Sequence, residues 1–194
     1  MKFPETYRCI QNFTGSSMED ILITPIKFED RIPLRKWRNE QIFHLRQQGL
    51  ISEEHQDKYF KQVVFPLFHQ EHPSQLLFSI YLNGLLVGYG GLVHTNWIDR
   101  YTELSFLTKT EILENDHNEY NRIFSIFIST MKNIVFEHLK FNRIFTETYS
   151  LRTEHIKILE SNGFLYEGSQ RKKILINGEY YDSLFHSILE ADER

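Results

Sequence analysis

Two Asn-Gly dipeptides restrict the fold of this chain more than any other feature of its sequence. Each lies between two strand-like segments: Asn83-Gly84 between residues 76–82 and 85–94, and Asn177-Gly178 between residues 164–176 and 179–189. Asn-Gly favours the tight turn of a β-hairpin, because both residues readily adopt a positive φ. The chain is therefore expected to contain two antiparallel strand pairs. Glycines at positions 88, 90 and 91 thin one strand, so another element should pack closely against its backbone.

The apolar pattern around these turns predicts the other elements. Helices are expected where apolar residues recur every three to four positions, and strands where short β-branched or aromatic runs occur. The predicted helices cover residues 28–45, 52–64, 120–139 and 154–161, and the predicted strands cover residues 21–23, 102–107 and 143–149. This order is typical of one mixed α/β domain over residues 20–194. Residues 1–19 form a leader that could add an edge strand around Tyr7.

Composition excludes several classes of function. The chain has 194 residues and a formal net charge of −4, so it has no basic field for nucleic acid. No apolar run approaches the roughly 20 residues that span a bilayer, and residues 1–20 lack the apolar segment of a signal peptide. Cys9 is the single cysteine, which fits a reducing compartment. We expect a cytoplasmic protein that binds neither nucleic acid nor membrane.

Four strings, in this order, resemble the GCN5-related N-acetyltransferase (GNAT) superfamily. They are residues 34–39 with 51–55, residues 83–92, residues 102–106, and residues 159–164 with 167–168 and 181–182. The similarity is greatest to the branch of ribosomal-protein N-terminal and nucleotide-sugar amine acetyltransferases. The resemblance implies one α/β (α+β) domain whose central twisted mixed sheet has about six to seven strands, splayed in the middle and flanked by about four helices. It also implies acetyl-CoA as the acyl donor.

The segment that should bind the diphosphate of CoA departs from the family pattern. The family usually has two glycines just before the long helix, whereas the matching residues 117–122 have none, and Glu111, Glu114, Asp116 and Glu119 crowd this loop. Two interpretations follow. Either free amides at the start of the helix bind CoA with help from Arg122, or the fold has lost CoA and become a binding module.

The resemblance also implies the position of the cofactor. The fourth strand of the family bulges near Phe106 or Leu107, so that a backbone N–H polarises the thioester carbonyl. The expected cofactor-binding residues lie on this strand, at the start of the long helix, and before the last helix: Ser105, Phe106, Leu107, Thr108, Tyr120, Asn121, Arg122, Ile123 and Arg152.

Three residues are candidates for proton transfer. Glu103 would act as general base through water, and His94 could share that role, since histidine exchanges protons near neutral pH. The position where the family often has an acidic tyrosine is Leu159, so Tyr149 is the substitute as general acid. The alternatives are a salt-bridged glutamate, a structural histidine and a tyrosine that forms only the wall of the cleft.

The acceptor site is expected around the first two helices, as in the family. Its candidates are Trp37, Arg38, Asn39, Arg46 and Gln47, although Trp37 could belong to the core. Their polar groups could bind a phosphate or carboxylate, which favours a nucleotide-linked amino sugar over a protein N-terminus.

The resulting hypothesis is an acetyl-CoA-dependent N-acetyltransferase that acts on a primary amine by direct attack. The alternative is a catalytically silent GNAT-fold binding protein. No metal is expected, because His69 and His72 lack a partner cluster. An exposed last strand would allow a homodimer.

Overall fold

Both Asn-Gly pairs form the hairpin turns predicted for them. Asn83 and Gly84 have φ values of 50° and 77° and join β3 (Leu76–Leu82) to β4 (Leu85–Asn96). Asn177 and Gly178 have φ values of 50° and 85° and join β7 (Leu165–Ile176) to β8 (Glu179–Leu189). In the computed structural model, which describes residues 1–193, the two hairpins belong to one sheet.

The sheet has eight strands in the order β1-β2-β3-β4-β5-β6-β8-β7. The four strands outside the hairpins are β1 (Ser16–Met18), β2 (Ile21–Pro25), β5 (Tyr101–Thr108) and β6 (Arg143–Tyr149). The leader supplies an edge strand, but that strand is β1; the segment beside Tyr7 forms a 3-10 turn, Arg8–Ile10. The last strand, β8, lies inside the sheet, because its hairpin partner β7 takes the edge.

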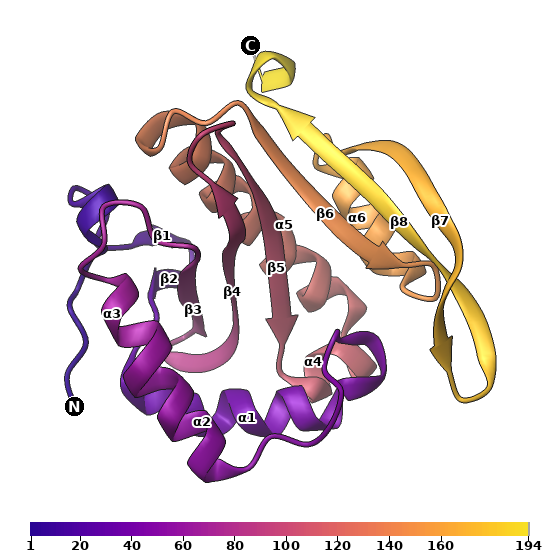
Figure 1. The fold of residues 1–194 in the computed structure, drawn as a ribbon, viewed down its shortest axis with the longest axis horizontal. Coiled ribbons are helices and arrows are strands. Elements are labelled where there is room, and N and C mark those ends of the chain that lie inside the picture. The colour runs from indigo at the N-terminus through magenta and orange to yellow at the C-terminus, as the bar shows by residue number, and fades with distance from the viewer. Residues whose placement is uncertain (194) are drawn as a thin grey trace.

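The sheet is splayed between β5 and β6, as expected. These strands are parallel and pair only from Tyr101 to Glu103 and from Arg143 to Phe145. Beyond Glu103, β5 continues to pair with β4, whereas β6 continues to pair with β8. The two halves of the sheet therefore diverge, and Figure 1 shows β5 and β6 separating towards their C-terminal ends.

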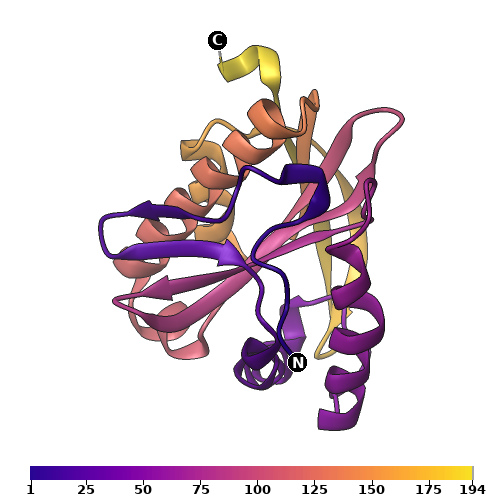
Figure 2. The same ribbon diagram turned by 90° about the vertical axis from the view of Figure 1, so that its left-hand side faces the viewer.

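Helices cover both faces of this sheet. On one face lie α1 (Arg31–Glu40) and α2 (Glu53–Tyr59), and α2 continues through the π-helical Phe60–Val64 into α3 (Phe65–Leu67). On the other lie α5 (His117–Asn133), which continues to His138, and α6 (Thr153–Ser161). Figure 2 shows the sheet between these layers. A short helix, α4 (Thr110–Asn115), was not predicted. No helix within residues 1–193 has the length and apolar character needed to cross a membrane.

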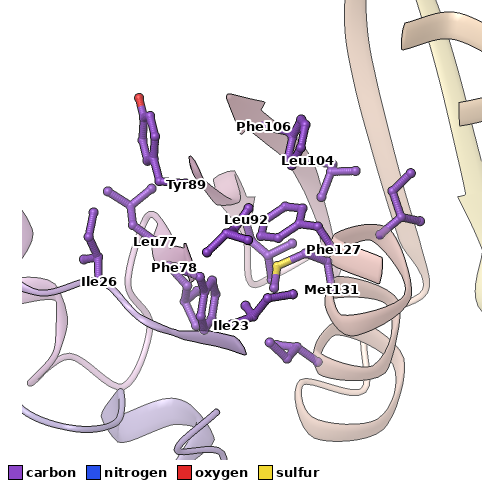
Figure 3. Packing of buried hydrophobic residues seen from close by; sticks show 14 of the residues in the cluster. Ile23, Ile26, Leu77, Phe78, Tyr89, Leu92, Leu104, Phe106, Phe127 and Met131 are labelled. Carbon is purple, nitrogen blue, oxygen red and sulfur yellow. The ribbon is translucent and has the colours of Figure 1, made fainter. Parts of the chain in front are cut away.

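The glycines of β4 allow α5 to approach the sheet. A Cβ atom at Gly90 would lie 2.7 Å from the Phe127 ring and 2.3 Å from the Ser105 carbonyl oxygen. Figure 3 shows Phe127 and Met131 directed at the buried leucines of the sheet. This confirms the close approach expected from the glycine pattern, and it fixes α5 behind the splayed strands.

The leader is part of the same core. Tyr7 is fully buried, with its ring stacked on Phe68 at a centroid distance of 4.0 Å. Its hydroxyl accepts from the Leu77 amide at 2.8 Å and donates to the Leu77 carbonyl at 3.0 Å. These contacts connect the leader to β3.

Candidate active site

A cleft of about 450 Å³ opens where β5 and β6 separate. Its walls come from β4 and β5, from β6, from the segment after α1, and from the start of α6. The lining includes the three expected catalytic residues and three of the expected cofactor residues: His94, Glu103 and Tyr149, and Ser105, Phe106 and Arg152.

Glu103 and His94 form a pair at the point where the strands part. The Glu103 side chain is 4% exposed, and its Oε2 lies 2.6 Å from Nδ1 of His94, whose side chain is 66% exposed. His94 has a φ of 50° and lies in an irregular stretch of β4 between Val93 and Asn96. A carboxylate accepts the Nδ1–H, so Nε2 becomes the basic ring nitrogen. This pair can therefore orient a histidine base toward the cleft.

The expected bulge in the strand 102–107 is absent, and the irregularity lies in the neighbouring strand. Phe106 pairs with Gly90 and Leu107 with Tyr89 without a shift in register. The register shifts instead beside His94. The β5 expectation is wrong because Gly88 and Gly90 let β4 pack closely against the backbone of β5 there, and the extra residue is accommodated beyond Val93.

A second carboxylate, Glu147 of β6, faces the same part of the cleft. Arg46 bridges Glu103 and Glu147, with Nη1 3.1 Å from Glu147. Glu147 also accepts from Lys173 at 2.6 Å and from the Ser183 hydroxyl at 2.5 Å. Burial acts to raise the pKa of Glu147, but Lys173, Ser183 and Arg46 outweigh it and hold that pKa below its usual range. We call Glu103, Glu147, Arg46, His94 and Lys173 the carboxylate cluster.

Tyr149 lies in the wall beside this cluster and is 6% exposed. Burial raises the pKa of its phenol; the charge of Arg46 opposes this shift, and the charges of Glu147 and Glu103 add to it. The hydroxyl therefore keeps its proton at neutral pH. This is the state that a general acid requires.

Arg152, His44 and His155 line the other end of the cleft, next to α6, and the buried Tyr120 of α5 contacts Arg152 from behind them. Arg152 donates from Nη2 to the Tyr120 hydroxyl at 3.1 Å and lies 3.3 Å from Nδ1 of His155. His44 is 6% exposed, and its Nε2 is buried without a hydrogen-bond partner in the described chain. Burial, followed by the charge of Arg152, lowers the pKa of His44 to about 3 and also lowers the pKa of His155. We call these four residues, Arg152, Tyr120, His155 and His44, the Arg152 cluster.

In the loop expected to bind the diphosphate, acidic side chains already occupy one helix amide and the Arg122 guanidinium. The Asp116 carboxylate caps α5 by accepting from the Glu119 amide at 3.0 Å. Arg122 is bound by Glu119, Asp20 and Glu19, with contacts of 2.7–2.9 Å. The other expected residues of this turn do not line the cleft: Ile123 is fully buried and Asn121 is exposed. Leu107 and Thr108 are also buried.

A second cavity of about 560 Å³ lies beneath α1 and α2. It shares Arg38, Gln75, Val93 and Ser105 with the cleft, so the two spaces adjoin. Its wall is mostly apolar and includes the following residues: Leu34, Leu50, Ile51, Tyr59, Phe60, Leu77 and Tyr89. An acceptor held here could present an amine to the carboxylate cluster.

The expected acceptor residues separate into three groups. Arg38 lines both spaces and donates to the Tyr89 hydroxyl at 2.6 Å and to Gln47 at 3.1 Å. Asn39 and Gln47 bind the segment after α1, because Asn39 donates to the Ile51 carbonyl and Gln47 to Gly49. Arg46 belongs to the carboxylate cluster, and Trp37, at 4% exposure, belongs to the core.

Several residues of the cleft were not predicted from the sequence, and two of them, Glu147 and His44, matter most for its chemistry. Glu147 shares a face of its strand with Tyr149, since side chains two apart point the same way, and this signal could have identified it. His44 lies after α1 in a segment that was read as helix, and its pattern carries no signal for a cleft. Among residues 1–193, no group of three or more His, Cys, Asp or Glu side chains could hold a metal ion.

The cleft fits an acyl-pantetheine arm. It lies between two strands whose facing edges are unpaired beyond Glu103 and Phe145. Such edges can bind an extended chain in the way that an added strand binds.

Comparisons with known proteins agree with this geometry. The model of the acetyltransferase (GNAT) domain matches residues 23–185. No curated protein sequence matches the chain. A spermidine N-acetyltransferase from Vibrio cholerae, in complex with CoA and spermine, has a similar fold with a TM-score of 0.77, 16% identity, and coverage of 90% of this chain and 98% of that one. The dodecameric structure of spermidine N-acetyltransferase from Vibrio cholerae, in an intermediate state, gives a TM-score of 0.73, 17% identity, and coverage of 91% and 97%. The chain therefore belongs to the acetyltransferase (GNAT) domain family, whose members are N-acetyltransferases that use acetyl-CoA.

Proposed function

We propose that this enzyme acetylates the primary amine of a small molecule by direct attack, with the His94–Glu103 pair as its base. The observation that carries the proposal is the 2.6 Å contact between His94 and Glu103 at the opening of the strands. A buried carboxylate on Nδ1 keeps the ring in the tautomer whose Nε2 can accept a proton. Because that ring is exposed in the cleft, it can reach the amine of an acceptor.

Bound acetyl-CoA supplies the acetyl group as a thioester. Nε2 of His94 takes a proton from the attacking amine, and Glu103 stabilises the imidazolium that forms. Tyr149 holds a proton at its hydroxyl for the sulfur that leaves. Arg46 pairs with Glu103 and Glu147, and Lys173 pairs with Glu147, so the two carboxylates are held in place beside the histidine.

For the acceptor, we propose a small-molecule amine that carries a phosphate or carboxylate, such as a nucleotide-linked amino sugar. The lining of the second cavity includes Arg38 but, within the described chain, no Asp or Glu. The side-chain hydrogen-bond partners of Arg38 are Tyr89 and Gln47, neither of which is a carboxylate, so its charge is available to an anionic group. A polyamine would place several positive charges beside Arg38, which is unfavourable.

The base is tested with Glu103→Gln, which keeps the shape of the side chain and removes its charge. Loss of a general base typically reduces the rate by about 10²–10⁴. We expect kcat to fall by at least about 100-fold, with the affinity for acetyl-CoA unchanged in calorimetry. An unaltered kcat across the pH range would remove Glu103 from the mechanism.

The acceptor is tested by comparing kcat/KM for a nucleotide-linked amino sugar, spermidine and a peptide with a free N-terminus. We expect the amino sugar to be preferred and Arg38→Gln to reduce that preference. A preference for spermidine, unaffected by Arg38→Gln, would contradict the assignment of the acceptor class while leaving the base intact.

A further inference from the structure

We propose that Arg152 anchors the diphosphate of CoA in this chain, in place of the backbone amides at the start of α5. The inference rests on the proposed function, because it assumes that the cleft binds acetyl-CoA. It concerns a different part of the site, however, and its test requires no acetyl transfer. The N-termini of α5 and α6 differ in the charges around them, and only that of α6 lines the cleft.

The start of α5 is unsuited to an anion. The Asp116 carboxylate already accepts from one of its first-turn amides, that of Glu119, and places a negative charge at this helix end. Glu119 lies in the same turn, and the one nearby cation, Arg122, is bound by three carboxylates. A diphosphate at the start of α5 would therefore be repelled by the carboxylates of Asp116 and Glu119.

Arg152 has the opposite character. It lies at the N-cap position of α6, and no side chain caps that helix. Its side-chain partners are the Tyr120 hydroxyl and Nδ1 of His155, and within residues 1–193 no ion pair joins it to a carboxylate. The half-buried guanidinium therefore lines the cleft with an uncompensated charge. A planar guanidinium matches the oxygens of a phosphate with two parallel N–H donors.

His44 is an independent sign that a polar ligand binds at this place. Its Nε2 is buried and unpaired, and the ring lines the same cleft as Arg152. Buried polar atoms without a partner are rare in proteins, and one that borders a cleft fits a ligand that completes its hydrogen bond. His44 follows α1 and Arg152 precedes α6, and both line the cleft, so a ligand bound there can contact both.

The neighbours of Arg152 also preserve its charge for the ligand. His44 and His155 are neutral at physiological pH, because burial and the Arg152 charge lower both pKa values. Tyr120 is buried and neutral, because burial raises the pKa of its phenol. The Arg152 cluster therefore carries a single positive charge, against which one diphosphate of CoA can be placed.

The experiment compares the binding of CoA with that of pantetheine, which has the same arm but no diphosphate. Calorimetry on the full chain would use wild type, Arg152→Gln, Arg152→Lys and, as a matched change of charge, Arg171→Gln at an exposed position of β7. We expect Arg152→Gln to weaken CoA at least tenfold, with pantetheine unchanged. Arg152→Lys should retain part of the affinity, and Arg171→Gln should match wild type. Thermal melting of each variant establishes that it is folded.

A fourth variant, Arg122→Gln, addresses the rival site at the start of α5. If the diphosphate lies at α5, Arg122→Gln weakens CoA and Arg152→Gln does not, and our inference is overturned. Failure of wild type to bind CoA more tightly than pantetheine would overturn it too. If wild type binds CoA more tightly than pantetheine and Arg152→Gln loses this difference in affinity, the anchor is supported. This holds even if the enzyme acetylates no amine, in which case only the proposed function fails.

Discussion

The two ends of the cleft differ in whether their charges are balanced by neighbouring side chains. In the carboxylate cluster, Glu103 and Glu147 are matched by Arg46 and Lys173, with His94 on Glu103. In the Arg152 cluster, one guanidinium lies among neutral groups. The first end is electrostatically complete without a ligand, which suits proton transfer within fixed residues. The second lacks a negative partner, which suits the binding of an anion.

The difference follows from where the residues lie in the fold. Glu103 and Glu147 come from the two strands that diverge, so a bridge by Arg46 spans the opening at its narrow end. Arg152 lies beyond the last residue of β6, where the strands are furthest apart. On β5, the side chain near Arg152 is the apolar Phe106, which stacks on Phe124 at a centroid distance of 4.2 Å. This strand therefore provides no group there that could neutralise the charge of Arg152.

The largest loss in stability is expected from Glu147→Ala, which removes a carboxylate from the carboxylate cluster, the end of the cleft whose charges are balanced. It removes the shared partner of Arg46 and Lys173, and so leaves Arg46 with Glu103 alone and Lys173 without a carboxylate partner in the described chain. Removing one member of a buried pair costs about 3–5 kcal/mol, and we expect about 2 kcal/mol here because Arg46 is half exposed. Urea unfolding measures this loss in free energy of unfolding.

The control for that change is Glu154→Ala, which removes an exposed carboxylate paired with Lys157 at 2.7 Å. Surface pairs of this kind contribute less than about 1 kcal/mol. Equal losses for the two variants would mean that the carboxylate cluster is an ordinary surface network.

Much of this architecture could be predicted from the sequence, because local signals determine it. The Asn-Gly turns fixed both hairpins, and the glycines of β4 indicated the close approach of α5. Glu103, His94 and Tyr149 were predicted as site residues, and the structure brings all three to one cleft.

The interactions that divide the cleft into two ends could not be predicted in this way. Arg46 and Glu103 are 57 positions apart in the sequence, and Arg46 lies in a loop without a periodic pattern, so nothing local predicts their ion pair. The acidic loop suggested a lost or altered phosphate site, but only the contacts show that Arg122 is taken by Glu19, Asp20 and Glu119. Sequence pattern reports which residues face together on one element, and these contacts connect different elements.

The next effect concerns acidification, which acts on the Arg152 end. His44 has a pKa lowered to about 3 in the folded chain, whereas the unfolded chain has the ordinary value of about 6.5. The unfolded state therefore binds this proton first. The contribution of neutral His44 to the free energy of unfolding is fully present above pH 6.5. It declines as the pH falls from there towards 3, by about 1.4 kcal/mol per pH unit for one such group.

This dependence is tested by urea unfolding at pH 7.0 and 5.5 for wild type and for His44→Gln. We expect wild type to lose more stability than the variant over this interval. His155→Gln should reduce the slope in the same direction, because its pKa is also lowered. A slope that is the same in all three proteins would show that the histidines of the Arg152 cluster are not held neutral.

The smallest effect comes from the helix terminus that the Arg152 anchor replaces. Asp116→Ala removes the cap of α5 and should cost about 1 kcal/mol of unfolding free energy, whereas Asp116→Asn keeps a side-chain acceptor and should cost much less. If the diphosphate lies at Arg152, CoA affinity is the same in Asp116→Asn and wild type at physiological salt. If instead it lies at α5, removing this like charge tightens CoA binding. The Asn variant therefore separates the two sites by the sign of its effect, with the helix still capped in both cases.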